Sequence, residues 1–397
     1  GQLGLAQRTK VIARLRETPS SAPLFARLIA VEVVVMGAAI GIATALARTG
    51  NPSLERPAPA SLAEGLTNYP EPAAPDATSW LTMWRWDWLW GTVAVVAILL
   101  YVGGVVRLMR RGDRWPVGRT IVWVLGWATF IWSVCGAPGV YGRVSFSWHM
   151  TSHMTIAMIV PILLVLAAPI TLIAPVESPR KDGTYGPREI VLGRVHSKYV
   201  AFWANPIVAG VNFVFGLIIF YYTPLFELAL TTHTGHVLMV IHFLLAGYLF
   251  AMVLIGVDPG PRKWAPALRL VVLFATMSFH AFFGVAIQSS TSLLAPGFFS
   301  IIHIPWIPDP LLDQQQGGAI AWGIGDVPSL LLAMLLVLSW VRSDDAEARR
   351  HDRQADRDHD ADLTAYNARL ASIAEHDAQE AARDAARLSG MPREGGS

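Results

Sequence analysis

Long apolar blocks with almost no charged residues are the feature that most restricts what this chain can fold into. An α-helix rises 1.5 Å per residue, so about 20 apolar residues cross the hydrocarbon core of a bilayer. Only helices and closed barrels satisfy their backbone hydrogen bonds in lipid, and apolar runs this continuous are typical of helices. Just 15% of the residues are charged, against about 25% in soluble proteins. We therefore predict an all-α, polytopic membrane helix bundle, which excludes a soluble enzyme.

Eight blocks have the length of a membrane-spanning helix. Trp and Tyr crowd several of their ends, as they do at membrane interfaces. The eight predicted helices lie near residues 24–47, 87–109, 119–135, 148–174, 205–223, 234–256, 267–289 and 318–341.

The distribution of Lys and Arg between alternate loops predicts the orientation of these helices, because cytoplasmic loops carry an excess of both residues. One side of the predicted bundle carries thirteen in its loops and the other side carries four. The thirteen lie within residues 107–119, 175–200 and 262–269, and the four are Arg48, Arg56, Arg85 and Arg143. We therefore expect both termini in the cytoplasm and the protein in the plasma membrane.

Composition divides the chain into four segments. Residues 1–49 form a basic lead-in and the first helix, and 50–83 form a Pro-rich outer linker, semi-rigid and unable to fold alone. Residues 84–341 hold seven helices, and 342–397 form a charged cytoplasmic tail. Apolar residues at helical spacing in the tail favour a weakly amphipathic, solvated helix. These residues are Leu363, Tyr366, Leu370 and Ile373.

Histidine and methionine alternate along the start of the fourth block. His149 and His153 are four residues apart and share a helix face, and Met150, Met154 and Met158 repeat at the same spacing beside them. Imidazole and thioether groups are soft ligands, and thioether selects Cu(I) over hard cations. The Met stripe taken alone is also typical of core packing. His153 lies well inside the block, where an ionisable residue indicates function.

Two later blocks place further histidines at a similar predicted depth. His242 and His280 each follow a methionine by three residues, and His236 lies nearer the outer mouth of the sixth block. On the predicted topology His153, His242 and His280 lie roughly 8–13 Å below the outer surface. This convergence favours one shared metal site, with polar hydrogen bonding between helices as the alternative. Cys135 is the only cysteine, so a metal site built from cysteine pairs is excluded.

The outer loop before the last block ends in the run Asp313-Gln314-Gln315-Gln316-Gly317-Gly318. Two interpretations remain open for this segment. An acidic residue ahead of a helix caps its free N–H groups, so Asp313 is a candidate cap for the last helix. Alternatively the segment forms a lid over the buried histidines, and Asp313 supports metal binding.

Taken together, these residues resemble the CtaG family of cytochrome c oxidase assembly factors, which are seven-helix membrane proteins of bacteria. The resemblance covers residues 84–341. It rests on four segments in this order: Trp148–Met154, His242–Gly247, His280 with Gly284, and Asp313–Gly318 followed by Trp322-Gly323 and Asp326-Val327-Pro328. The residues that we predict to hold the metal are His149, His153, Met154, His236, His242, His280 and Asp313.

The resemblance implies delivery of Cu(I) to the heme–copper subunit of cytochrome c oxidase during assembly. Cu(I) would enter from the outer face, bind two or three neutral histidines with Met assistance, and leave by ligand exchange. No covalent bond is made, so we do not expect an enzyme. Because metal binding needs deprotonated imidazoles, copper occupancy should fall as the pH drops through about 6. The expected partners are the oxidase subunit, the lipid bilayer and, in a homo-oligomer, a second copy; no nucleic acid is expected.

The lone first helix, with Arg27, Leu28 and Glu32, resembles the end of a copper-resistance D (CopD) domain, as in actinobacterial fusions ahead of CtaG. Because the chain begins with Gly1, we expect it to start within a longer precursor or after an expression remnant. Two alternative functions remain. A membrane copper transport or resistance protein would also need inward-facing ligands, and a b-type heme protein would use paired histidines on facing helices.

Overall fold

The computed structural model describes residues 59–176, 197–258, 264–358 and 361–389, together with the isolated positions 33, 37, 41 and 193. Helices are the only regular elements in these ranges, which confirms the all-α prediction. The chain divides into two compact units, Gly1–Leu336 and Val337–Ser397.

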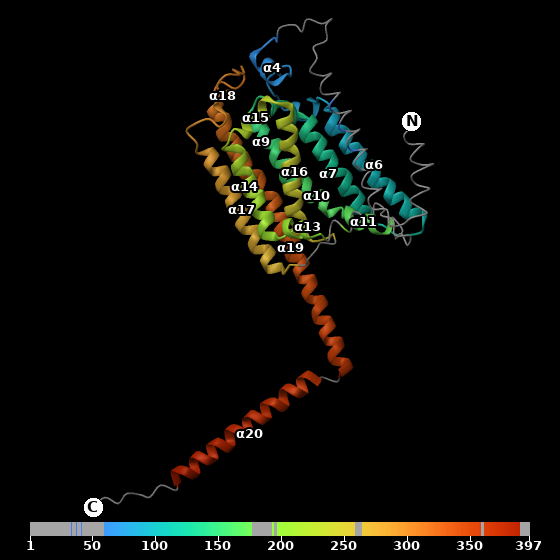
Figure 1. Ribbon diagram of the computed structural model, residues 1–397, viewed down its shortest axis with the longest axis vertical. Coiled ribbons are helices and arrows are strands. Elements are labelled where there is room, and N and C mark those ends of the chain that lie inside the picture. Colours follow the sequence, from blue (N-terminus) through green and yellow to red (C-terminus); the bar gives the residue numbers. More distant parts are fainter. Residues whose placement is uncertain are drawn as a thin grey trace, which may run out of the picture. The chain divides into compact units, whose positions relative to one another are not determined.

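The first unit is a bundle of long helices (Figure 1). These are α6 (Trp88–Arg110), α7 (Val117–Cys135), α9 (Phe146–Met154) continued by the π-helix η2 (Thr155–Ile159) and α10 (Val160–Leu166), α14 (Pro206–Tyr221), α16 (His233–Ile255), α17 (Pro266–Gln288) and α19 (Pro310–Asp358). Helix α6 packs on α7, α7 on α10, and α10 on α16. Helix α14 packs between α16 and α17. The segment α9–η2–α10 therefore lies inside the bundle, with α7 on one side and α16 on the other.

Six helices among the described residues are long and apolar enough to cross a membrane, and a bent pair brings the number to seven. They correspond to seven of the eight predicted blocks. The remaining block, 24–47, lies outside the described residues except for three isolated positions. The last helix begins at Pro310, eight residues before the predicted block, because the polar run from Asp313 to Gln316 is already helical.

The bent pair consists of α14 and α15 (Leu225–Thr231), whose axes differ by 69°. Pro224 lies between them, and a proline has no N–H to continue the helical hydrogen bonds. Asn205 caps the start of α14 by accepting the N–H of Ile207 at 2.9 Å. The start of the helix predicted at 205–223 is therefore confirmed. The chain bends sharply at the predicted end of this helix, between α14 and α15.

Short elements close the two ends of the bundle. Helices α4 (Leu62–Thr67), α15 and α18 (Pro296–Phe299) lie at one end, which we call the capped end, and α11 (Pro169–Val176) and α13 (Lys198–Trp203) lie at the other (Figure 1). Helices α5 (Ser79–Thr82) and α8 (Ala137–Tyr141) contact each other. The indole of Trp306 donates to the carbonyl of Pro72 at 3.1 Å. Residues 59–83 of the Pro-rich segment therefore pack on the bundle.

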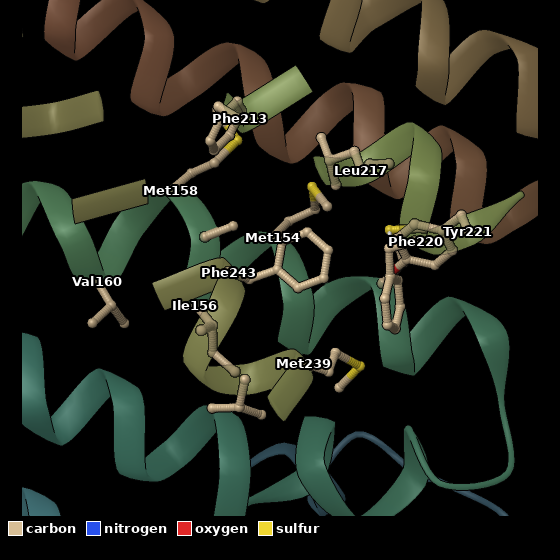
Figure 2. Close-up of a cluster of buried hydrophobic side chains, with 14 of the residues drawn as sticks. Met154, Ile156, Met158, Val160, Phe213, Leu217, Phe220, Tyr221, Met239 and Phe243 are labelled. Atoms are coloured by element: carbon tan, nitrogen blue, oxygen red, sulfur yellow. Dashed lines mark hydrogen bonds between the residues drawn. The ribbon is translucent and has the colours of Figure 1, made fainter. Parts of the chain in front are cut away.

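Buried aromatic and aliphatic side chains fill the space between α9–η2, α14 and α16. Figure 2 shows Met154 and Met158 pointing into this cluster, among Phe213, Leu217 and Phe243. Helix α16 approaches η2 closely at Gly247, where an added Cβ would overlap the carbonyl oxygen of Ala157. A π-helix turn within an α-helix is frequent at functional sites, and here it follows the two histidines of α9 directly.

The second unit, Val337–Ser397, contains the end of α19 and α20 (Ala361–Ser389). Leu363, Tyr366, Leu370 and Ile373 lie on α20 and are all exposed. The predicted helix of the tail is thus confirmed, and its apolar stripe faces solvent.

Candidate metal site

Two imidazoles lie together at the capped end of the bundle, on α9. The rings of His149 and His153 are stacked obliquely with their centroids 4.4 Å apart, because a spacing of four residues places them one turn apart on one face. Their exposed fractions are only 3% and 2%. Phe226 of α15 covers His149, and Phe243 of α16 covers His153. Both imidazoles are therefore shielded from water.

The hydrogen bond of His149 fixes its tautomer. Its Nδ1 lies 3.3 Å from the carbonyl oxygen of Gly142, and a carbonyl only accepts hydrogen bonds. A neutral His149 therefore carries its proton on Nδ1 and a lone pair on Nε2. That Nε2 atom is buried and has no hydrogen-bond partner among the described residues. In metal-binding histidines, the ring nitrogen that does not bind the metal usually donates its N–H to an acceptor such as a backbone carbonyl.

Tyr221 of α14 orients the second imidazole. Its hydroxyl lies 2.8 Å from Nδ1 of His153 and 3.7 Å from the sulfur of Met150. If His153 donates from Nδ1 and the hydroxyl donates to the sulfur, every one of these groups is satisfied. Nε2 of His153 then also carries a lone pair, and this buried atom likewise has no partner in the described part of the chain. Tyr221 was not among the predicted site residues.

A small cavity of about 10 Å³ adjoins both imidazoles. His236 and Met239 of α16 also line it, together with Ser152 of α9. Its volume is near the minimum for one water molecule, which is also the scale of a single ion. The structure thus brings His236, a half-buried residue in the first turn of α16, to the same cavity as His149 and His153.

A second pair of soft donors lies deeper in the bundle. Nε2 of His280 on α17 is 3.3 Å from the sulfur of Met154 on α9. Both side chains are at most 2% exposed. Helix α19 approaches the imidazole at Gly325, where an added Cβ would lie 2.6 Å from Cε1 of His280. Two donor atoms at this separation can bind one ion, since metal–nitrogen and metal–sulfur bonds are about 2.0–2.3 Å long.

The structure does not place His242 with the other predicted ligands. This side chain is exposed and lies against Gly216 of α14. It lines an apolar groove of about 520 Å³ between α14 and α16. The similar depth of His153, His242 and His280 along their helices therefore does not bring the three imidazoles to one point. Among the described residues, no three His, Cys, Asp or Glu side chains are grouped closely enough to hold a metal ion.

Asp313 caps a helix other than its own. Its carboxylate accepts the N–H of Phe146 at 2.7 Å and the hydroxyl of Ser145 at 3.0 Å, at the start of α9. It also accepts the hydroxyl of Ser147. The start of α19 is instead capped by Asp309, which accepts the N–H groups of two following residues. The prediction that Asp313 caps the last helix is therefore wrong: the residue, which is 9% exposed, caps the helix that carries His149 and His153.

The neighbouring glutamines fix the loop between α17 and α19. Gln314 is fully buried, and its amide accepts the N–H of Leu294 at 2.6 Å and donates to the carbonyl of Ser292 at 2.9 Å. Gln315 donates to the carbonyl of Ser290 at 2.9 Å. The polar run therefore joins residues 290–294 and the start of α9 to one helical turn of α19, at the capped end.

Comparison with known proteins identifies the family. The chain matches the model described as "Cytochrome c oxidase caa3 assembly factor (Caa3_CtaG)" over residues 99–343. It is 41% identical over 307 residues to an uncharacterized protein of Mycobacterium leprae, a match that covers 77% of this chain and 47% of the relative. Uncharacterized proteins of Mycobacterium bovis and Mycobacterium tuberculosis are 42% identical over 307 residues, which cover 77% of this chain and 46% of each relative.

The chain spans about half the length of these curated relatives. No solved structure matches it. The family match extends from α6 to the part of α19 that follows Pro328, and so contains every residue predicted to hold the metal. This chain, a multi-pass helical protein by its apolar spans, belongs to the cytochrome c oxidase caa3 assembly factor family.

Proposed function

We propose that this protein binds Cu(I) in the buried His/Met cluster and passes it to the heme–copper subunit of cytochrome c oxidase during assembly. The membership of an oxidase assembly factor family supports the general role. The observation that carries the copper proposal is the pair of buried, unpartnered Nε2 atoms of His149 and His153. Leaving a buried polar atom without a partner costs about 1–3 kcal/mol. A metal ion bound to both lone pairs would remove that cost.

The donor set matches Cu(I) in chemistry. Beside the two imidazoles the cavity is lined by the imidazole of His236, the thioether of Met239 and the hydroxyl of Ser152, among apolar residues. Thioether and imidazole donors suit Cu(I), whereas Mg²⁺ and Ca²⁺ require oxygen ligands. The Met154–His280 pair continues the same donor types at the residue that follows His153 on α9. We assign His149 and His153 to an entry site, with His236 beside them at the same cavity, and Met154 and His280 to a second position reached by ligand exchange.

Asp313 supports this arrangement without touching the ion. Its carboxylate holds the first turn of α9 through Phe146 and two serines. Since His149 lies in the next turn, the cap sets the position of the imidazole relative to α16 and α15. We propose that Asp313 is a positioning residue for copper binding.

The alternatives receive less support from the described residues. A b-type heme would need room for a porphyrin beside the histidines, and the cavity there is about 10 Å³. A transporter would need a second set of ligands toward the opposite end of the bundle. We retain the CopD-like assignment of residues 1–49 as a proposal that rests on Arg27, Leu28 and Glu32, which lie outside the described residues.

Copper analysis of the full chain tests the proposal. The protein is purified in detergent under reducing conditions, loaded with Cu(I), and measured by mass spectrometry of the metal and by competition with a Cu(I) chelator. We expect about one Cu(I) bound tightly per chain, and a loss of affinity of at least about 10-fold in the double variant His149→Ala/His153→Ala. The control is His303→Ala, since His303 is exposed in the loop after α18.

Two further readouts separate the possible outcomes. Unchanged copper affinity in the double variant would overturn the copper site while leaving family membership intact. An absorption spectrum with a Soret band would favour heme instead. In cells, the same variant should lower copper in the oxidase; full oxidase loading alongside lost binding in vitro would show that binding at this site is not the delivery step.

A further inference from the structure

Two arginines share one aromatic partner at the capped end of the bundle. The guanidinium carbon of Arg85, just before α6, lies 4.9 Å from the ring centroid of Tyr69. The guanidinium carbon of Arg143, in the turn between α8 and α9, lies 4.7 Å from the centroid of the same ring. Both arginine side chains are half-buried. Two cations are thus held near each other by a ring whose face attracts positive charge.

The two arginines and Tyr69 border a cavity of about 30 Å³. Trp86 and the carboxylate-bearing Asp87 also line it. Its volume is enough for one or two water molecules, or for the oxygens of an oxyanion. Val134, Gly139 and Val140 complete its apolar wall.

The charge in this cavity is not balanced within the described part of the chain. Neither guanidinium forms an ion pair with a carboxylate of the described residues. Asp87 is the one acid that lines the cavity, and its carboxylate caps α6 by accepting the N–H of Trp90 at 3.1 Å. Arg85 donates one N–H to the carbonyl of Pro70 at 3.3 Å. Each guanidinium has five N–H donors, so most of them remain available.

Both groups keep their charge despite burial. Removal from water lowers the pKa of Arg85 and of Arg143. An arginine titrates above pH 12 in water, so both guanidinium groups stay protonated at neutral pH. A pair of charged, partly desolvated guanidiniums is a strong receptor for phosphate or carboxylate oxygens, which accept two parallel N–H bonds from each fork.

The surroundings indicate where the oxyanion comes from. Trp86 lines the cavity, and Trp84 and Trp88 lie close to it in sequence at the start of α6; the exposed fractions of Trp84, Trp86 and Trp88 are 48%, 45% and 79%. Exposed tryptophans at the end of a membrane helix lie at the depth of the lipid headgroups. Guanidinium groups at this depth lie within reach of lipid phosphates, whose oxygens accept paired N–H bonds from them. The nearest abundant oxyanion to this cavity is therefore a lipid phosphate.

We propose that Arg85 and Arg143, with Tyr69 and Trp86, form an oxyanion site that binds the phosphate of an anionic phospholipid headgroup. The acyl chains would then lie along α6, whose outward residues Leu99 and Leu100 are 64% and 72% exposed. The bound lipid would join residues 59–83 to the start of α6 and the turn before α9.

Lipid retention by the full-length protein tests this site. The protein is purified in an uncharged detergent, mixed with phosphatidylglycerol or phosphatidylcholine, and examined by native mass spectrometry and by its unfolding temperature. We expect the wild type to retain phosphatidylglycerol at least about 10-fold more strongly than phosphatidylcholine, because both headgroups carry the phosphate but the two guanidiniums repel the choline cation. The double variant Arg85→Gln/Arg143→Gln should lose that preference.

Three further arms make the result interpretable. Arg119→Gln is the matched control, because Arg119 also lies over an aromatic ring, the indole of Trp115, at 5.1 Å, but does not line this cavity. The variant Arg85→Lys/Arg143→Lys keeps both charges and should retain part of the preference, which separates lost binding from misfolding. Inorganic phosphate is the third arm: stabilisation by phosphate but not by phosphatidylglycerol would replace the lipid with a free anion. Equal retention of the two lipids by the wild type, or an unchanged preference in the Gln double variant, would overturn the proposal.

Discussion

The carboxylate of Asp313 on α19 accepts the backbone N–H of Phe146 at 2.7 Å, across 167 residues of sequence. The contact caps the helix that carries His149 and His153. The first N–H groups of a helix have no partners within that helix. Here one of them donates to a side chain of α19, a helix much later in the sequence. The last helix and the helix that carries the two imidazoles are thereby joined through one side chain.

Removing this carboxylate should affect stability and copper binding together. Asp313→Ala removes the acceptor of the buried N–H of Phe146, which should cost about 1–3 kcal/mol. Asp313→Asn keeps one oxygen acceptor and should cost less, since Asn and Asp cap helices about equally well. We expect both variants to lower Cu(I) affinity, the alanine variant more, as measured by chelator competition and thermal unfolding in detergent.

Asp309→Asn is the matched control for the Asp313 variants. Asp309 caps α19 itself and is exposed, so its change should leave copper affinity unaltered. Copper affinity at the wild-type level in a stable Asp313→Asn protein would reduce Asp313 to a structural cap.

Loss of the Tyr221 hydroxyl should weaken copper binding while the protein stays folded. Tyr221→Phe removes the oxygen 2.8 Å from Nδ1 of His153 and keeps the ring that packs beside it. The orienting partners of metal-binding histidines typically contribute 10–100-fold to metal affinity. We expect a loss in that range by Cu(I) competition.

Tyr222→Phe controls for the Tyr221 change, since the neighbouring Tyr222 is 52% exposed. If both phenylalanine variants bind copper as the wild type does, then Tyr221 does not orient a ligand and His153 is a packed core histidine.

Gly247→Ala should destabilise the bundle. An added methyl group would overlap the carbonyl oxygen of Ala157 in η2, which is backbone and cannot rotate away. Overpacking of this kind costs about 1–3 kcal/mol or more. Gly323→Ala is the control, because an added Cβ on that helical glycine meets nothing within 4 Å, and alanine is the better helix former by about 1 kcal/mol. Thermal unfolding of both variants should shift in opposite directions; a fully stable Gly247→Ala protein would contradict the close approach.

The predicted orientation is tested by reporter fusions. A reporter after Arg342 should be active in the cytoplasm, and one inserted between Ala73 and Ala74, both exposed, should be active outside. The reason is the excess of Lys and Arg in the loops on one side. Activity of both reporters on the same side of the membrane would require a different number of spans between them.

The membrane helices were predictable because lipid imposes a simple rule on sequence: about 20 apolar residues per span. The rule fails where polar residues face protein instead of lipid. Gln314 is fully buried and doubly hydrogen-bonded, so the last helix begins earlier than its hydropathy indicates. The bend at Pro224 was signalled by the proline, but its direction depends on how α15 packs against α16.

The candidate site was predictable in part for a related reason. Position along a helix fixes the depth of a residue in the membrane, and so the depths of His153 and His280 could be estimated from sequence. Depth does not fix the direction in which a side chain points, which depends on the neighbouring helices. His149 and His153 could be placed on one face because they share a helix. Tyr221 gave no signal, because its role follows from a contact between α14 and α9.

The predicted membrane depth of His242 and its position in the structure lead to opposite predictions for its role in copper binding. By depth alone, His153, His242 and His280 should contribute about equally to copper binding, and each Ala substitution should weaken it about 10-fold or more. In the structure His242 lies at an apolar groove against Gly216, whereas Nε2 of His280 contacts the sulfur of Met154. We therefore expect His280→Ala to reduce Cu(I) affinity and His242→Ala to leave it within about 2-fold of the wild type, when both are measured by the same chelator competition. Met154→Leu should act in the same direction as His280→Ala but less strongly, since thioether is the weaker donor. A loss of affinity in His242→Ala as large as that in His280→Ala would mean that α16 rotates when copper binds and brings the three imidazoles together.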